Sequence, residues 1–320
     1  MSMRLITKLV YTSFNGLLLL ALYSCGNNSG DPVATVGRGG ALPGALTISI
    51  TDAAVDSAKE VWVQFSGASI KPTDGDAIQF TFDAVQNINL LDLQGTLFSY
   101  LIKDNAIPAG HYDWVRLNVN ASNDNVTDSY IVLDDGSVHE LWIPSGSETG
   151  LKINTGFEIA ANEKLNLMID FDLRKSVVVS NGSYTLRPTL RMMPVSETGT
   201  ITGTIDSALL IEGQCSDNVP ATGNAVYLYA GKDIVPVDIR NGGSGPLTSA
   251  GVYLNASSGN YEYTIGYVLV GEYTLAFTCQ ADLDVADVKD SLIFSFSENI
   301  TVIADSDSPG PVIVPFEPVR

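Results

Sequence analysis

The sequence contains little histidine, cysteine and positive charge. Its 320 residues include two histidines and three cysteines, and 17 lysines or arginines are set against 36 aspartates or glutamates. An acidic surface repels phosphate backbones, so the net charge of −19 argues against a nucleic-acid partner. The same repulsion acts on anionic headgroups, so any membrane attachment has to come from a lipid.

Common catalytic patterns are missing as well. The sequence has no GxSxG, no HExxH and no glycine-rich phosphate loop. The best acid pair is Asp170 and Asp172, whose two-residue spacing predicts that both carboxylates lie on one strand face. Because Arg174 continues that face, a charge-paired strand surface is a simpler interpretation than acid–base catalysis. We therefore predict a non-enzymatic protein, with a polysaccharide hydrolase as the less favoured alternative.

The sequence has no hydrophobic run long enough to cross a bilayer of about 30 Å. Its N-terminal apolar stretch is continuous only from Leu17 to Leu22, and two basic residues precede it, which predicts a signal peptide over residues 1–24. An ordinary secretory signal with cleavage nearby is one interpretation. The residues LYSC at 22–25 instead resemble the bacterial lipobox, although Tyr23 stands where a smaller residue is usual.

The lipobox resemblance implies that Cys25 carries a diacylglycerol and an amide-linked acyl chain, and more than one chain gives stable anchoring. Gly26 follows the cysteine, which by resemblance to enterobacterial lipoproteins favours the outer membrane. Residues 25–44 are rich in Gly, Asn, Ser and Pro and are expected to form a flexible tether with an end-to-end distance of roughly 25 Å. Without residues 1–24, 15 basic and 36 acidic residues remain, a net charge of −21.

The two remaining cysteines, Cys215 and Cys279, are an even pair in an exported protein, which predicts a disulfide. Metal-binding thiols are the alternative, but no histidines lie nearby in the sequence. A disulfide that closes a loop of this length would stabilise the fold by about 4 kcal/mol.

From Ala45 onward, apolar and polar residues alternate with a period of two, which predicts an all-β protein. We expect two β-sandwich-like domains (immunoglobulin-like or prealbumin-like) at 45–197 and 198–304, followed by a Pro-rich tail at 305–320. One short helix is expected at 96–106, capped by Thr96. The predicted inward faces are Leu46, Ile48 and Ile50; Val61, Val63 and Phe65; Val115, Leu117 and Val119; and Leu165, Leu167, Ile169, Phe171 and Leu173.

A glycine-x-tyrosine step precedes a strand in both predicted domains, at Gly110–Tyr112 and at Gly271–Tyr273. Glycine permits a tight turn, and the tyrosine can lie across a sandwich corner. The second instance follows a Tyr-x-Tyr strand and resembles the prealbumin-like or carboxypeptidase-regulatory-like sandwich, which belongs to the carbohydrate-binding-like folds.

The first predicted domain carries a longer set of ordered motifs. These are ITDAAVD at 50–56, VWVQFSGASI at 61–70, NLLDLQG at 89–95, IPAGHYDWVRLNV at 107–119, IPSGSETGLKI at 143–153, IDFDLRKSV at 169–177 and YTLRPTLR at 184–191. In this order they resemble the domain-of-unknown-function family 4382, an exported bacterial domain found on lipoproteins. The resemblance covers roughly residues 45–195 and implies no activity.

The three tryptophans give the best indication of a binding surface. Each tryptophan is directly adjacent in the sequence to apolar residues of a predicted strand. Because neighbouring side chains of a strand point to opposite faces, we expect the indoles to lie on the face opposite the main apolar one. A sugar ring could stack on such a platform, whereas burial of the indoles as a second core layer is the structural alternative. The candidate ligand-binding residues are Trp62, Gln64, Trp114, Arg116, Asn118, Trp142, Asp170 and Asp172.

Acidic stretches at 282–290 and 305–308 keep calcium possible, although neither matches an EF-hand loop and no other cofactor is indicated. Together these observations predict a lipid-anchored binding or adhesion-type protein of the bacterial cell envelope. Glycan is the expected ligand class, and a scaffold that docks other envelope proteins is the alternative.

Overall fold

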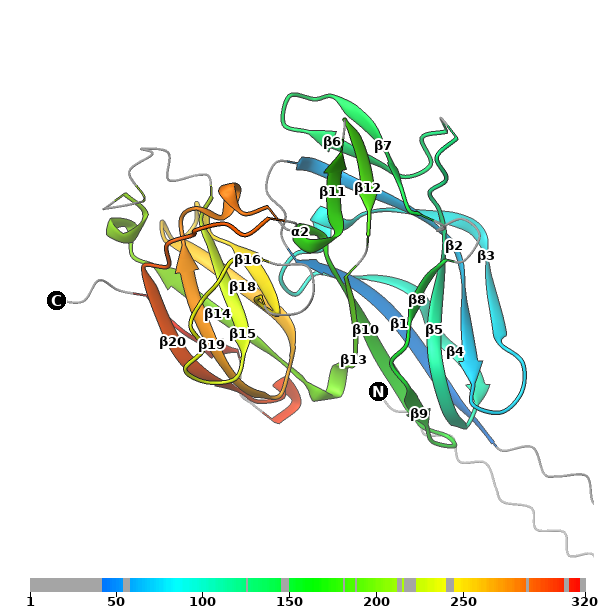
Figure 1. Cartoon of the computed structure of the whole chain (residues 1–320). Coiled ribbons are helices and arrows are strands. Elements are labelled where there is room, and N and C mark those ends of the chain that lie inside the picture. The colour runs from blue at the N-terminus through cyan, green and yellow to red at the C-terminus, as the bar shows by residue number, and fades with distance from the viewer. Residues whose placement is uncertain are drawn as a thin grey trace, which may run out of the picture. The chain divides into compact units, whose positions relative to one another are not determined.

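In the computed structural model, the regular secondary structure of the described part of the chain is almost entirely β-strand (Figure 1). The structure describes residues 42–53, 58–124, 126–144, 150–180, 182–187, 189–211, 215, 223–239, 245–285, 288–307 and 311–316. The predicted signal peptide, Cys25 and all but the last three residues of the predicted tether lie outside these ranges. Residues 41–320 form one compact unit.

Two sheets make up the first sandwich, which spans residues 43–194. One has the strand order β13 (Leu190–Pro194), β10 (Lys164–Asp172), β1 (Pro43–Ala53) and β4 (Ser99–Pro108). The other has the order β11 (Val177–Ser180), β12 (Ser183–Leu186), β7 (Val138–Trp142), β6 (Tyr130–Leu133), β2 (Ala58–Pro72), β5 (Gly110–Asn120) and β8 (Leu151–Ile153), with β3 (Ile78–Asn89) on β2 and β9 (Phe157–Ile159) on β5.

The core of the first sandwich consists of the apolar residues that alternate along these strands. Val61, Val63 and Phe65 of β2 are fully buried, and Phe65 meets Phe171 of β10 edge to face across the two sheets. The predicted inward sets of β1, β5 and β10 belong to the same core, as do their partly buried neighbours. Alternation of hydrophobic residues therefore identified the inner faces correctly.

The helix expected at 96–106 is wrong, because this segment is largely strand β4, paired antiparallel with β1. The pairing shifts register on both sides of Ile48. Such an irregularity lets two consecutive residues, Leu101 and Ile102, both be buried, whereas Leu97 and Phe98 are exposed. The α-helix in the described part of the chain is α2 (Leu173–Ser176). Short 3-10 turns lie at η1 (Leu90–Leu93), η2 (Val195–Glu197), η3 (Ser207–Leu210), η5 (Ala281–Leu283) and η6 (Asp305–Asp307).

The second sandwich spans residues 198–316 and has two four-stranded sheets. One has the order β17 (Tyr253–Leu254), β18 (Tyr261–Leu269), β14 (Thr198–Ile205) and β21 (Val312–Ile313), and the other β16 (Thr248–Gly251), β15 (Ala225–Ala230), β19 (Gly271–Thr278) and β20 (Phe296–Val302). Its core is separate from that of the first sandwich. The predicted disulfide is present between Cys215 and Cys279, with 5.5 Å between the Cα atoms.

Part of the segment expected to be a tail is built into the second sandwich. Strand β21 pairs parallel with β14, and the backbone N–H groups of Val314 and Phe316 donate to Thr202 and Thr204 carbonyls. Phe316 is fully buried in the core. No helix in the described part of the chain is long and apolar enough to cross a membrane.

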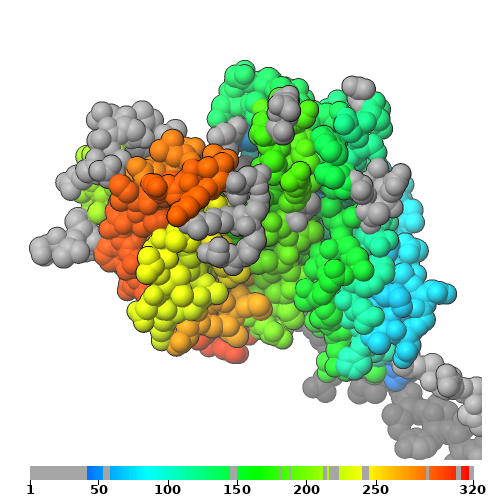
Figure 2. Space-filling view, viewed as in Figure 1, coloured from blue at the N-terminus to red at the C-terminus, as the bar shows by residue number. Residues whose placement is uncertain are grey.

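Figure 2 shows the same view with all atoms drawn, coloured from blue at the N-terminus to red at the C-terminus. The described residues between 225 and 260, coloured yellow to light orange, contribute to the face that is visible there.

Candidate functional site

The outer face of the nine-stranded sheet, meaning the side turned away from the core, carries most of the predicted ligand-binding residues. Along β2 and β5, buried apolar residues alternate with partly buried polar and aromatic ones. The latter include Trp62, Gln64, Trp114, Arg116 and Asn118. None of the three indoles belongs to the buried core.

One end of the outer face is aromatic and acidic. The ring of Trp62 stacks on Tyr130 of the adjacent strand β6, with 6.1 Å between ring centroids and 23° between ring planes. The Trp62 indole N–H donates to Glu60 Oε2 at 2.6 Å. Tyr130 lies opposite Glu140 of β7, and Trp142 follows two residues later on the same side of that strand.

At the other end, cations flank an indole. Arg116 and Lys152 lie 5.0 and 4.8 Å from the centre of the Trp114 ring, and these two residues are directly opposite each other on β5 and β8. Cation–π attraction fixes the position of the ring. Arg116 Nε is buried and has no hydrogen-bond partner among the described residues.

The two indoles lie too far apart to form one stacking platform. Strands β2 and β5 are neighbours, but Trp114 lies opposite Lys71, which is nine residues beyond Trp62 on β2. At about 3.3 Å per residue this separation is roughly 30 Å. A single sugar ring cannot reach both indoles, whereas an extended chain can.

Side-chain amides occupy the middle of the outer face. Gln64 Nε2 donates to Asn87 Oδ1 of β3 at 2.9 Å, and Asn120 Nδ2 of β5 donates to Gln64 Oε1. This amide ladder crosses three adjacent strands. Asn118 of β5 lies opposite Gly67 of β2. Its amide nitrogen lies so close to Gly67 that a Cβ atom added to this glycine would be 3.3 Å away. The outer face therefore offers amide donors and acceptors between two aromatic ends.

Asp170 and Asp172 are not part of this face, which corrects the prediction that grouped them with the tryptophans. They lie on β10 of the other sheet and are 5 % and 1 % exposed, so they are not a strand surface either. Asp170 Oδ2 accepts from Arg191 Nε at 3.0 Å and from Arg191 Nη2. Burial raises the pKa of Asp170, and the Arg191 charge partly offsets this effect.

Arg174 does not continue the strand, because β10 ends at Asp172 and the chain turns into α2. Arg174 Nη1 donates to the Tyr227 hydroxyl at 3.2 Å and to the Ala281 carbonyl at 3.1 Å. Lys175 pairs with Asp172 at 2.7 Å and donates to the Pro246 and Leu247 carbonyls. These charges therefore connect α2 to segments of the second sandwich.

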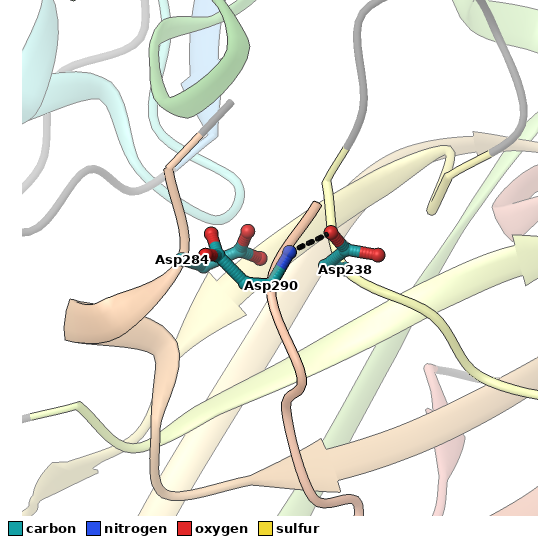
Figure 3. Close-up of side chains that lie close together, drawn as sticks. All are labelled: Asp238, Asp284 and Asp290. Carbon is teal, nitrogen blue, oxygen red and sulfur yellow. Dashed lines mark hydrogen bonds between the residues drawn. The ribbon is translucent and has the colours of Figure 1, made fainter. Parts of the chain in front are cut away.

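Three aspartates of the second sandwich lie close together (Figure 3), two of them from the acidic stretch at 282–290. One carboxylate oxygen from each of Asp238, Asp284 and Asp290 lies within 4.8 Å of the others. Asp284 accepts from the Tyr227 hydroxyl at 2.6 Å, and Asp238 Oδ2 accepts from the Asp290 backbone N–H at 2.6 Å. Burial raises the pKa of Asp284, and the Tyr227 hydrogen bond partly offsets this effect.

The aspartate cluster does not supply a calcium site by itself. Calcium takes six to eight oxygen ligands, whereas these carboxylates already accept hydrogen bonds from the protein. The positive charge of Arg174 also favours the ionised form of Asp284, which acts to lower its pKa. Calcium therefore stays a prediction for this stretch.

Sequence reasoning missed several residues that complete these arrangements. Asn120 is not among them, because the alternation along β5 already groups it with Arg116 and Asn118. Tyr130 and Lys152 had no recognisable signal, since only strand pairing brings them beside Trp62 and Trp114. Arg191 likewise becomes the partner of Asp170 only through the pairing of β10 with β13.

Three solved structures that the chain resembles give no functional guidance. The TIE protein of Bacillus anthracis is 13 % identical with a TM-score of 0.18, and the match covers 86 % of this chain but only 33 % of that protein. The minor pilin of Streptococcus agalactiae is 11 % identical with a TM-score of 0.19, covering 86 % of this chain and 97 % of that one. The major pilin subunit of Bacillus cereus is 11 % identical with a TM-score of 0.20, covering 86 % and 99 %.

Likeness at this level carries no argument about function, and no curated protein matches the sequence. The family comparison agrees with the ordered motifs of the first sandwich. Residues 43–188 match the model described as "Domain of unknown function (DUF4382)", so the chain contains a domain of that family.

Proposed function

We propose that this protein is a non-enzymatic binding module of the bacterial cell envelope and that lipid on Cys25 anchors it. Its ligand binds along the outer face of the nine-stranded sheet. The proposed ligand is an extended, uncharged glycan. Lipid anchoring rests on the lipobox resemblance and on the short N-terminal apolar run. The outer membrane is the proposed location.

The observation that carries the glycan proposal is the amide ladder between two separated aromatic ends. Sugar hydroxyls both donate and accept hydrogen bonds, and Asn and Gln amides do the same. The partly exposed rings of Trp62 and Trp114 offer apolar surface for sugar rings at each end. The roughly 30 Å between them suits a chain of several rings and disfavours a disaccharide.

Intrinsic tryptophan fluorescence tests this proposal. The full mature chain in detergent is titrated with uncharged polysaccharides and their short oligomers, with and without calcium. We expect a saturable spectral shift with long chains and weak binding of disaccharides. Trp62→Ala and Trp114→Ala should each weaken binding by about fivefold, because one aromatic contact contributes about 1 kcal/mol.

Tyr100→Ala is the matched control, since Tyr100 is an exposed aromatic residue of β4 in the other sheet. It should leave the affinity unchanged. If no glycan shifts the fluorescence, the glycan proposal fails and a scaffold that docks envelope proteins becomes the leading function.

A polysaccharide hydrolase is less favoured. Paired-carboxylate hydrolysis needs two acids on either side of one substrate. Asp170 lines a cavity, but Asp172 is not among the residues that line it and is engaged by Lys175. Retention of any measured hydrolysis in Asp170→Asn would remove this pair from consideration.

A further inference from the structure

A polar cavity of about 190 Å³ lies within the compact unit 41–320 and is separate from the outer face. Its lining comes from β1, β10, β13 and the residues Gln94 and Gly95 of the first sandwich, and from β16, β17 and β18 of the second. None of the tryptophans contributes to it. At about 190 Å³ it has room for one small ring.

Ser249 places an unused hydroxyl in this cavity. It is 4 % exposed, and its Oγ has no hydrogen-bond partner among the described residues. The neighbouring Ala250 packs in the core of the second sandwich, so alternation along β16 turns Ser249 to the opposite side. A buried hydroxyl without a partner is costly, which makes Ser249 a candidate ligand contact.

Asp170 supplies an acceptor on the other side of the cavity. Thr51, Asp170 and Arg191 lie directly opposite one another across β1, β10 and β13, and all three line the cavity. Both hydrogen bonds from Arg191 go to Asp170 Oδ2, which leaves Oδ1 available as an acceptor. The Arg191 pair keeps this buried carboxylate in place.

The composition of the lining selects the class of ligand. Three acids, Asp52, Asp170 and Glu262, line the cavity with only one basic residue, Arg191, which disfavours an anion. Hydroxyl and amide groups complete a lining that can both donate and accept hydrogen bonds. Tyr253, which is 52 % exposed, adds an aromatic ring against which a sugar ring could pack.

We propose that this cavity binds a single uncharged, polyhydroxylated ring, either a free monosaccharide or the terminal residue of a glycan, with Ser249 Oγ and Asp170 Oδ1 as hydrogen-bonding contacts. This second site is independent of the outer face. A ligand there would contact both sandwiches at once.

Ligand-observed NMR on the full mature chain in detergent tests the proposal with methyl glucoside, methyl galactoside, N-acetylglucosamine and glucuronate. We expect saturable binding of at least one uncharged ring and none of glucuronate. Ser249→Leu should abolish binding by filling the cavity. Ser249→Ala should weaken it by about threefold to tenfold, the usual value of one hydrogen bond.

Two controls separate this site from the outer face and from misfolding. The double variant Trp62→Ala, Trp114→Ala should bind the single ring with unchanged affinity, even if long glycans no longer bind. Amide shifts at Ser249 and Thr264 on ligand addition report the location directly, and the Ser249→Ala melting curve establishes that this variant is folded. Binding to a chain-end glycan but not to the free ring would assign the ligand to a glycan terminus.

The proposal is overturned if neither an uncharged free ring nor a glycan chain end binds, if glucuronate binds equally well, or if folded Ser249→Ala binds with unchanged affinity. If nothing binds, the Ser249 hydroxyl has only water as a partner. Loss of single-ring binding in the tryptophan double variant would also overturn it, because the ring would then occupy the outer face.

Discussion

Tyr112 and Tyr273 make the same hydrogen bond in the two sandwiches. The Tyr112 hydroxyl donates to the Pro108 carbonyl at 2.5 Å and the Tyr273 hydroxyl to the Leu269 carbonyl at 2.7 Å, in each case four residues earlier. Each tyrosine lies two residues after a glycine that begins a strand. This geometry matches the tyrosine corner of immunoglobulin-like sandwiches and confirms the glycine-x-tyrosine prediction.

Removing either corner hydroxyl should destabilise the protein. We expect Tyr112→Phe and Tyr273→Phe each to lower the free energy of unfolding by about 1 kcal/mol, because each leaves a carbonyl without its partner. Urea unfolding measures the change. Tyr184→Phe is the control, since the Tyr184 hydroxyl has no hydrogen-bond partner among the described residues, and it should change stability by less than about 0.5 kcal/mol. Equal effects of all three variants would contradict a structural role for the corner bonds.

The disulfide should contribute strongly to stability. It joins residues 64 positions apart, and the chain-entropy model gives about 4 kcal/mol for a loop of that length. We therefore expect the double variant Cys215→Ala, Cys279→Ala to unfold at a much lower urea concentration. Cys25→Ala, which leaves the bridge intact, serves as the control. A loss below about 1 kcal/mol would contradict the prediction.

Arg174 should be far more sensitive to substitution than an ordinary arginine. Its guanidinium is buried, donates to Tyr227 and Ala281, and lies over the Tyr227 ring at 5.6 Å. We expect Arg174→Met to cost about 3 kcal/mol, because buried partners lose their charge-assisted hydrogen bonds. Thermal unfolding of Arg187→Met, an exposed arginine of the same sandwich, provides the comparison and should differ little from the parent chain.

Stability should depend on pH through Asp284. Burial raises the pKa of Asp284, so the folded state keeps this proton at a higher pH than the unfolded chain does. The contribution of Asp284 to the free energy of unfolding must then fall as pH rises from about 4 through the raised pKa. Unfolding measured at several pH values should show that Asp284→Asn loses this part of the pH dependence.

Asp290→Asn removes the same charge from the same cluster and is the control for general charge repulsion in this acidic protein. It should retain the Asp284 contribution. If the free energy of unfolding depends on pH in the same way in Asp284→Asn and Asp290→Asn, the negative charge of the cluster determines this dependence, and protonation of Asp284 does not.

The sequence predicted local features well, because these depend on residues close in the chain. Alternation located the inward faces of β1, β2, β5 and β10, and the glycine-x-tyrosine steps located both corners. Counting cysteines in a chain that we expect to be exported predicted the bridge between Cys215 and Cys279. The helix expected at 96–106 failed because Leu101 and Ile102 are both buried at a register shift within a strand, whereas Leu97 and Phe98 are exposed.

Relationships between strands could not be read from the sequence. Trp62 and Trp114 were expected on one platform, but the antiparallel register of β2 and β5 sets them nine residue positions apart. Asp170 was expected to pair along its own strand, and instead pairs with Arg191 of β13. Ser249 had no signal at all, since its importance depends on what faces β16.

By itself, then, the sequence determined which residues of each strand turn inward, where the chain turns, and the acidic charge that disfavours anionic partners. The period of two follows from the geometry of a single strand and needs no knowledge of its neighbours. Tertiary structure alone decided which strands pair, in what register, and which buried charges meet. Those outcomes depend on packing between segments far apart in the chain, and local preference does not encode them.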